Sequence, residues 1–253
     1  MVWYLSLHKK IDDMKVSIIL PTFNEVGNIL ELIQDLRRIL SESYDLEIIV
    51  VDDGSTDGTR ELLSGDGSQL VDFLICRDSD RGLAQSLHAG ISIASGDQIL
   101  VMDTDFTHDP EEALLMLELS EHFDIVSGSR FAQGGTMSNS RHYMASFLFN
   151  MVLRLILRTQ VQDNTGGYWT AKTTTIRRLP LDVVFKGFGE YYFRLLFLSF
   201  QLGASIVEVP SHYGKRRSGQ SKANFIKMIF TYSKSAITFR IKIRNAENQT
   251  GLN

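Results

Sequence analysis

Two acidic residues, one position apart, follow a short apolar run near the middle of the chain. Residues 99–102 read ILVM, which is typical of a buried central strand, and Asp103 and Asp105 come directly after it. Asp109 and Pro110 then favour the start of a helix. Ligand sites in open α/β sheets lie beyond the carboxyl ends of strands, where two such carboxylates repel each other unless a cation lies between them. The pair therefore predicts a site for a divalent cation with oxygen ligands that carries a phosphate.

Two other apolar runs end in polar clusters of the same kind. Residues 16–20 are followed by PTFNE, and residues 47–51 are followed by DDGS. The start of a helix after a strand attracts anions, and the Asp53 carboxylate can accept hydrogen bonds from a ribose or a base. We therefore expect a base-and-ribose pocket beside the cation–diphosphate site. The chain has no GxGxxG or Walker motif, which argues against a dinucleotide or an ATP held by a P-loop.

The order of the elements predicts how these clusters come together. Strands are predicted at 16–20, 47–51, 71–76 and 98–102, and helices at 24–40 (capped by Asn24), from 59, at 82–94 and at 110–120. Such alternation indicates an α/β fold, a Rossmann-like and mostly parallel sheet with helices on both faces. Its strand ends then meet at one edge.

The pattern changes after residue 128. A Gly- and Ser-rich loop precedes an apolar helix at 141–158, and TGGY at 165–168 leads into a strand. A helix at 190–202, a strand at 204–209 and a long helix from 222 follow. We predict one domain over 1–220, with a nucleotide-binding half at about 15–128 and a second half at 129–220. A basic amphipathic helix and tail occupy 221–253.

Composition limits the function classes further. The chain has 253 residues, 43% of them hydrophobic, a net charge of −4 and one cysteine, so it builds a core without an intramolecular disulfide. Residues 212–244 contain no Asp or Glu but many Lys and Arg, which favours an anionic partner. We expect no secretory signal and no spanning helix, because no run of about 18 apolar residues occurs.

Six sequence blocks follow one another along the chain: VSIILPTFNEVGNI, EIIVVDDGSTDGT, RGLAQSLHAGI, ASGDQILVMDTD, IVSGSRF and EVPSHYGKRRSGQSK. In this order they resemble family 2 glycosyltransferases of the A-type fold. The last block, with TGGY upstream, points to dolichol-phosphate mannose synthases and related polyprenyl-phosphate glycosyltransferases. The resemblance implies transfer of a sugar, most often from GDP-mannose, to the phosphate of a long isoprenoid lipid.

The resemblance implies a role for each matching residue. Asp103 and Asp105 would bind Mg²⁺ or Mn²⁺ on the donor diphosphate, and Asp105, Arg130 and Arg216 would be the catalytic residues. The half at 129–220 would hold the acceptor. The residues implied for the acceptor phosphate are Arg130, Arg141, Arg216, Ser221 and Lys222, and those for the nucleotide sugar are Pro21, Phe23, Glu25, Val51, Asp53, Asp103, Thr104, Asp105, Thr107 and Lys186.

The implied chemistry needs no dedicated base. A lipid phosphate is anionic at neutral pH and can attack the anomeric carbon directly, with inversion, when a metal and basic side chains bring the two anions together. An alternative keeps the fold but moves glucose or GlcNAc from a UDP-sugar to a glycan hydroxyl, with Glu190 as the candidate base. A second alternative is a nucleotide-sugar-binding protein without turnover. A nucleic-acid partner is not expected, because no recognisable module accompanies the basic tail.

Two helices are predicted to contact a membrane. Those at 141–158 and 222–244 combine apolar residues with Lys and Arg, so they can lie in the interface of a bilayer with anionic head groups. Core packing competes with this interpretation for the first helix, and a homodimer interface competes for the second. The expected location is the cytoplasmic face of a membrane, with peripheral attachment.

Overall fold

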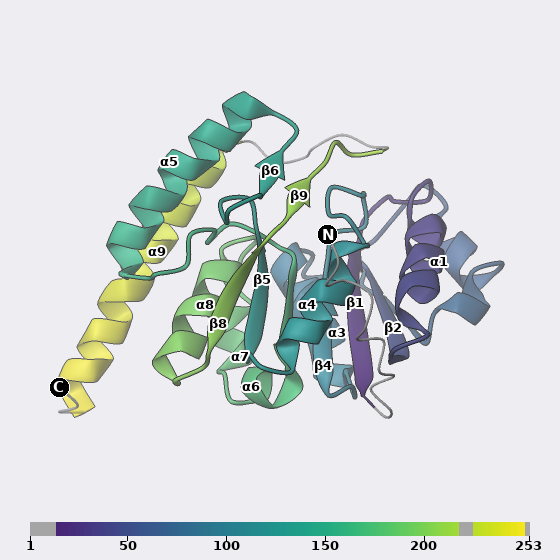
Figure 1. Ribbon diagram of the computed structural model, residues 1–253, viewed down its shortest axis with the longest axis horizontal. Helices are drawn as coiled ribbons and strands as arrows, with labels where there is room; N and C mark the ends of the chain where they lie inside the picture. The colour runs from purple at the N-terminus through teal and green to yellow at the C-terminus, as the bar shows by residue number, and fades with distance from the viewer. Residues whose placement is uncertain (1–13, 218–224, 251–253) are drawn as a thin grey trace, which may run out of the picture.

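The computed structural model describes residues 14–217 and 225–250, and within these residues a seven-stranded sheet forms the centre of the molecule (Figure 1). Its strand order is β3-β2-β1-β4-β7-β5-β8. All neighbours pair in parallel except β7, which is antiparallel to both β4 and β5. The strands are β1 (Lys15–Thr22), β2 (Asp45–Asp52), β3 (Phe73–Cys76), β4 (Gln98–Val101), β5 (Ile125–Ser129), β7 (Trp169–Lys172) and β8 (Ile206–Pro210).

Alternating side chains of the central strands serve two cores. On β1, Val16, Ile18 and Leu20 pack on one face beneath α1 (Ile29–Leu40) and α4 (Glu112–Ser120), while Ile19 faces α3 (Leu83–Ile93) on the other. Gly90 allows α3 to approach closely, since a Cβ there would lie 2.7 Å from Cγ2 of Ile19. The expected α/β fold, with a mostly parallel sheet between helices, is confirmed.

The second half adds strands to the same sheet. Strand β5 was not predicted, because its sequence, IVSGS, merges into the Gly- and Ser-rich loop. The TGGY segment at 165–168 leads into β7 as expected, and α6 (Thr173–Arg177), α7 (Leu181–Val184) and α8 (Tyr191–Gln201) cover the same face as α3. Two short strands, β6 (Thr136–Met137) and β9 (His212–Tyr213), form a second, parallel pair. The division into a nucleotide half and an acceptor half stays a prediction.

Helix starts differ from the sequence prediction in two places. Asn24 does not cap α1, because it takes a left-handed conformation (φ 58°) and its side chain accepts a hydrogen bond from the backbone N–H of Thr56. The helix begins only at Ile29. Asp109 likewise stabilises the turn before α4 by accepting from the N–H of Glu111. Both polar residues organise loops at the carboxyl edge of the sheet. The 3₁₀ turn η1 (Ser68–Leu70) and the short helix α2 (Thr59–Ser64) lie between β2 and β3.

Helices α5 (Ser140–Leu157) and α9 (Phe225–Thr250) lie side by side at one end of the molecule (Figure 1). They share a third core with α8, built from large apolar side chains such as Phe149, Phe193 and Phe239. Within residues 14–217 and 225–250, no helix has both the length and the apolar character needed to cross a bilayer.

Candidate active site

A cavity of about 300 Å³ opens at the carboxyl ends of β1, β2 and β4. The three clusters predicted from the strand ends meet there, as the parallel arrangement requires. The N-terminus of α3 and a loop before α8 complete the walls. The lining residues are Pro21, Thr22, Phe23, Glu25, Asp53, Gly82, Leu83, Ser86, Asp103, Thr104, Asp105, Phe188 and Arg216.

Asp105 is the more enclosed carboxylate of the central pair. The residue is 2% exposed, and its Oδ2 lies 2.9 Å from Nη1 of Arg216. Its Oδ1 accepts hydrogen bonds from the Thr107 N–H at 2.9 Å and from the Thr107 hydroxyl at 2.6 Å. Thr107 therefore fixes the orientation of the carboxylate and does not line the cavity itself.

Asp103 lines the cavity beside Asp105, in surroundings that disfavour its ionised form. Burial and the neighbouring Asp105 carboxylate raise the pKa of Asp103, and the positive charge of Arg216 opposes the shift. The backbone N–H of Asp103 donates to Nδ1 of His108 at 3.1 Å. Burial lowers the pKa of His108 to about 4, so this ring is neutral at pH 7 and carries its proton on Nε2.

The donor set of this pair fits a divalent cation. Carboxylate oxygens are the ligands that Mg²⁺ and Mn²⁺ prefer, and the raised pKa of Asp103 marks a place where added positive charge stabilises the ionised form. In the part of the chain that the structure describes, no group of three or more His, Cys, Asp or Glu residues offers a cage for a metal. A metal held here would take its remaining ligands from a diphosphate and water.

Asp53 organises the opposite wall of the cavity. Its Oδ2 accepts from the N–H of Gly82 at 2.7 Å, and its Oδ1 lies 3.1 Å from Nη1 of Arg77. These contacts fix the start of α3 against the end of β2. Gly54 follows with φ at +85°, a conformation that other residues rarely adopt, so the chain turns sharply at the rim. Asp53 and Phe23 line the same cavity.

The segment 214–217 crosses over the acidic pair. The N–H of Gly214 donates to the Thr107 carbonyl at 2.8 Å, and the N–H of Arg217 donates to the Asp105 carbonyl at 3.2 Å. The Arg217 guanidinium also lies 3.8 Å from the centre of the Phe106 ring, a cation–π contact. These bonds position Arg216 with its charge directed at the site.

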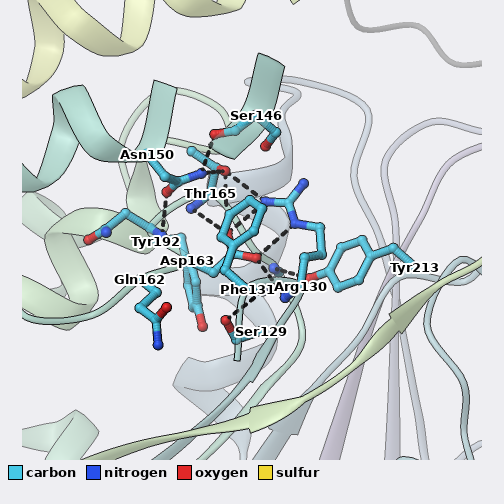
Figure 2. A network of polar contacts seen from close by, with 12 residues as sticks. Ser129, Arg130, Phe131, Ser146, Asn150, Gln162, Asp163, Thr165, Tyr192 and Tyr213 are labelled. Carbon is cyan, nitrogen blue, oxygen red and sulfur yellow. Dashed lines mark hydrogen bonds and ion pairs between the residues drawn. The ribbon is translucent and has the colours of Figure 1, made fainter. Parts of the chain in front are cut away.

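Arg130 does not line the cavity, and a buried carboxylate binds its guanidinium (Figure 2). Its Nε and Nη2 lie 2.7 and 2.6 Å from the two oxygens of Asp163, which is fully buried. The guanidinium also packs 4.7 Å from the centre of the Tyr213 ring, and Tyr213 contacts His108 edge-on. The rings of Tyr213 and His108 therefore lie between the Arg130 guanidinium and the backbone of Asp103.

Other predicted residues lie apart from the cavity. Val51 is fully buried in the core between β2 and α3, and Arg141 is exposed in the first turn of α5. Lys186 is exposed, and its carbonyl accepts a hydrogen bond from Arg194. Glu190 is buried and accepts from the N–H of Phe188 at 3.0 Å, so it stabilises the loop before α8. Ser221 and Lys222 fall outside the described residues.

The prediction missed several residues of the site. Ser86 and Leu83 line the cavity, and their only signal was the RGLAQSLHAGI block that opens α3. Phe188 also lines it, although its loop has no periodic pattern. Nothing in the sequence pairs Asp163 with Arg130, because 33 residues separate them.

Comparison with known proteins agrees with this geometry. The family model described as glycosyl transferase family 2 matches residues 17–179. The chain belongs to this family. The matched residues begin within β1, extend just past α6 and include the acidic pair and Arg130, so the expected family is confirmed.

Relatives of this family 2 chain include two named lipid-phosphate mannosyltransferases. It is 33% identical over 225 residues to the dolichol-phosphate mannosyltransferase of Pyrococcus furiosus. The aligned residues cover 87% of this chain but only 62% of the relative. It is 33% identical over 216 residues to the undecaprenyl-phosphate mannosyltransferase of Micrococcus luteus, covering 83% of this chain and 87% of the relative.

Solved structures with the same fold are more distant in sequence. Glucosyl-3-phosphoglycerate synthase of Mycobacterium tuberculosis, in complex with Mn²⁺ and UDP-glucose, superposes with a TM-score of 0.68 at 19% identity. The match covers 90% of this chain and 79% of that one. The same enzyme has been crystallised with Mg²⁺ and UDP. These matches confirm the expected glycosyltransferase fold.

Proposed function

We propose that this family 2 glycosyltransferase moves a hexose from a nucleotide sugar to the phosphate of a polyprenyl lipid, with mannose from GDP-mannose as the first candidate. The observation that carries the proposal is the single cavity that joins Asp53, the Asp103–Asp105 pair and Arg216. A nucleoside fits at Asp53, a diphosphate at the acidic pair and a second anion at Arg216. The names of the relatives from Pyrococcus and Micrococcus support the same acceptor class.

Asp103 and Asp105 are the residues that would hold Mg²⁺ or Mn²⁺. The ion would supply positive charge at the leaving diphosphate and lower the cost of its departure. Thr107 would keep Asp105 in place for this purpose through its two hydrogen bonds. Arg216 shares the charge of Asp105 and has a side chain 37% exposed, so it is free to turn toward a bound phosphate.

The acceptor would need only to be positioned. A lipid phosphate is already an anion at neutral pH, so the enzyme's task is to overcome its repulsion from the donor diphosphate. Attack in line with the leaving group inverts the anomeric carbon. A hydroxyl acceptor would need a base instead, but Glu190 is buried and bonded to the backbone of its own loop. The lipid phosphate is therefore the better-supported acceptor.

The lipid tail would approach along α5 and α9. Helix α5 exposes an apolar stripe at successive helical turns, and α9 exposes a second stripe beside Lys234, Lys242 and Arg244. Apolar side chains bordered by basic ones suit the surface of a membrane with anionic head groups. We infer peripheral attachment at the cytoplasmic face. The stripes comprise Met144, Leu148, Met151, Val152 and Leu155 on α5, and Phe230, Ile237 and Ile241 on α9.

The test compares donors and acceptors directly. The full chain is incubated with GDP-mannose, UDP-glucose or UDP-GlcNAc, together with polyprenyl phosphate or, as the matched control, the corresponding polyprenol. Mass spectrometry of the lipid phase then identifies the product. We expect one hexose on the lipid phosphate and none on the polyprenol.

Two other outcomes would support the alternative functions. Nucleoside diphosphate released only with a glycan acceptor would support the hydroxyl-acceptor alternative and a role for Glu190. Donor binding without any release, whatever the acceptor, would support a binding protein without turnover.

A further inference from the structure

Of the ion pairs among the described residues, Arg130–Asp163 is the least exposed, and it lies within a network of polar contacts (Figure 2). The side chains of Arg130 and Asp163 are 8% and 0% exposed. Burying two charges costs several kcal/mol, and apolar residues of similar volume often stabilise a fold as well or better. A buried ion pair is therefore weak evidence of a stabilising role, and a functional role is worth testing.

Asp163 is itself held rigidly. The backbone N–H groups of Arg130 and Thr165 donate to its two oxygens at 3.2 Å each. Its own N–H donates to Glu208 on β8 at 2.9 Å. Backbone N–H groups therefore hold the carboxylate, and Glu208 holds the backbone of Asp163, so the position of Asp163 does not depend on the Arg130 side chain alone.

These contacts restrict the guanidinium to one orientation. Nε and one N–H of Nη2 bind the Asp163 oxygens in a forked arrangement, and Nη2 also binds the Thr165 hydroxyl at 2.8 Å. The Tyr213 and Phe131 rings pack against the group at 4.7 and 5.2 Å. Among the described residues, none accepts a hydrogen bond from the remaining nitrogen, Nη1, which keeps two N–H donors for a ligand.

The same contacts join the arginine to α5. Asn150 of α5 donates to the Thr165 hydroxyl at 2.9 Å, and its Oδ1 accepts from the N–H of Asn164 at 2.7 Å. The Phe131 ring packs edge-on against Tyr143 and Phe147 of this helix. Arg130 is thus joined through Thr165 to the buried side of α5, the helix whose exposed side carries the apolar stripe.

We propose that Asp163 is a positioning residue, which orients the Arg130 guanidinium so that Nη1 binds the phosphate of the lipid acceptor. This inference rests on the proposed function. Asp163 does not touch the substrate. It acts through Arg130, and the Thr165 hydroxyl assists by binding the same nitrogen that faces Asp163.

The experiment measures steady-state kinetics of Asp163→Asn in the full chain, with GDP-mannose and polyprenyl phosphate. Asparagine keeps the shape but loses the charge and one acceptor oxygen. We expect the KM for polyprenyl phosphate to rise about tenfold or more while the KM for the donor stays within about twofold. Asp124→Asn is the matched control, since Asp124 pairs with Lys172 at the other end of β5 and should leave both constants unchanged.

The possible results separate the inference from the proposed function. Wild-type protein that transfers nothing to polyprenyl phosphate overturns the proposed function. An active wild type with an unchanged acceptor KM in Asp163→Asn, or with both KM values raised together, overturns only the role of Asp163. Thermal unfolding and GDP binding report whether the variant folds. If it does not, Thr165→Val decides: a rise of about threefold in the acceptor KM alone supports the inference, and no rise contradicts it.

Discussion

At the scale of single residues, the site depends on how charges are paired before substrate binds. Asp105 is nearly inaccessible and is neutralised by Arg216, whereas Asp103 is open to the cavity and has a raised pKa. A bound cation would relieve the repulsion between the two carboxylates and release Arg216 for a phosphate. If the proposed function holds, cation and donor would therefore favour each other's binding at this pair.

This arrangement predicts the effect of changing Arg216. We expect Arg216→Ala to lower kcat for sugar transfer by about a hundredfold or more. The substitution would remove a positively charged hydrogen-bonding group beside the leaving diphosphate and the acceptor phosphate. Arg216→Lys should recover part of the rate, since lysine keeps the positive charge but lacks the planar guanidinium. Stopped-assay kinetics measure both variants.

Arg38→Ala is the matched control for that experiment. Arg38 pairs with Asp35 and Glu111 on the surface, away from the cavity, and its loss should leave kcat unchanged. Equal rates for Arg216→Ala and Arg38→Ala would contradict the role given to Arg216.

At the scale of elements, the ends of strands determine both function and stability. The carboxyl ends hold the cavity, and the opposite ends of β1 and β2 are joined to the end of α3 by the buried Glu47. Its carboxylate binds Lys15 at 2.8 Å, and the hydroxyls of Ser17 and Ser95 donate to it. Burial alone would raise the pKa of Glu47, but these hydrogen bonds outweigh it and lower the value to about 2.

The depressed pKa predicts a pH dependence of stability. The contribution of Glu47 is fully present above its unfolded pKa of about 4.5 and is lost as the pH falls toward 2. We expect Glu47→Gln to lower the free energy of unfolding at pH 7 by about 2–3 kcal/mol and to flatten its slope between pH 4.5 and 2. Urea denaturation at several pH values measures this.

A neighbouring acid on the same strand provides the comparison. Asp45 is exposed at the start of β2, so Asp45→Asn should change the unfolding free energy by less than about 0.5 kcal/mol. An unchanged pH profile in Glu47→Gln would show that Glu47 does not contribute through its charge.

The sequence predicts which residues follow the ends of strands, but not the direction in which each strand runs. The apolar runs ending in PTFNE, DDGS and DTD were sufficient to place Asp53, Asp103 and Asp105 at one edge, because parallel strands bring their carboxyl ends together. The antiparallel insertion of β7 between β4 and β5 could not be predicted, since periodicity carries no information on strand direction. The pairing of Arg130 with Asp163 depends on that insertion and was missed with it.

At the scale of the whole molecule, the cavity and the apolar stripes occupy different regions joined by the second half of the chain. Helices α5 and α9 form one end of the molecule, and the contacts of Asn150 and Phe131 lead from there toward Arg130 (Figures 1 and 2). The arrangement suits a reaction whose donor comes from water and whose acceptor comes from a membrane.

The apolar stripes predict membrane binding. We expect the double variant Leu155→Glu/Phe230→Glu to bind vesicles containing anionic lipid about tenfold more weakly or worse than wild type, because two exposed apolar side chains become charged. Sedimentation with vesicles measures the binding. Transfer to a short, water-soluble polyprenyl phosphate should persist.

Phe73→Glu tests whether any exposed apolar residue would have the same effect. Phe73 is 46% exposed on β3, which forms the opposite edge of the sheet from β8, and Phe73→Glu should leave vesicle binding unchanged. Undiminished vesicle binding by the double variant would exclude the stripes as the membrane contact.

Sugar transfer to a lipid phosphate is tested most simply with radiolabelled mannose from GDP-mannose, polyprenyl phosphate and Mn²⁺, for wild type and Asp105→Asn. We expect label in the lipid phase from wild type only when Mn²⁺ is present, and a loss of about a hundredfold or more in the variant. Lipid labelled equally well with EDTA, or by Asp105→Asn, would contradict this expectation.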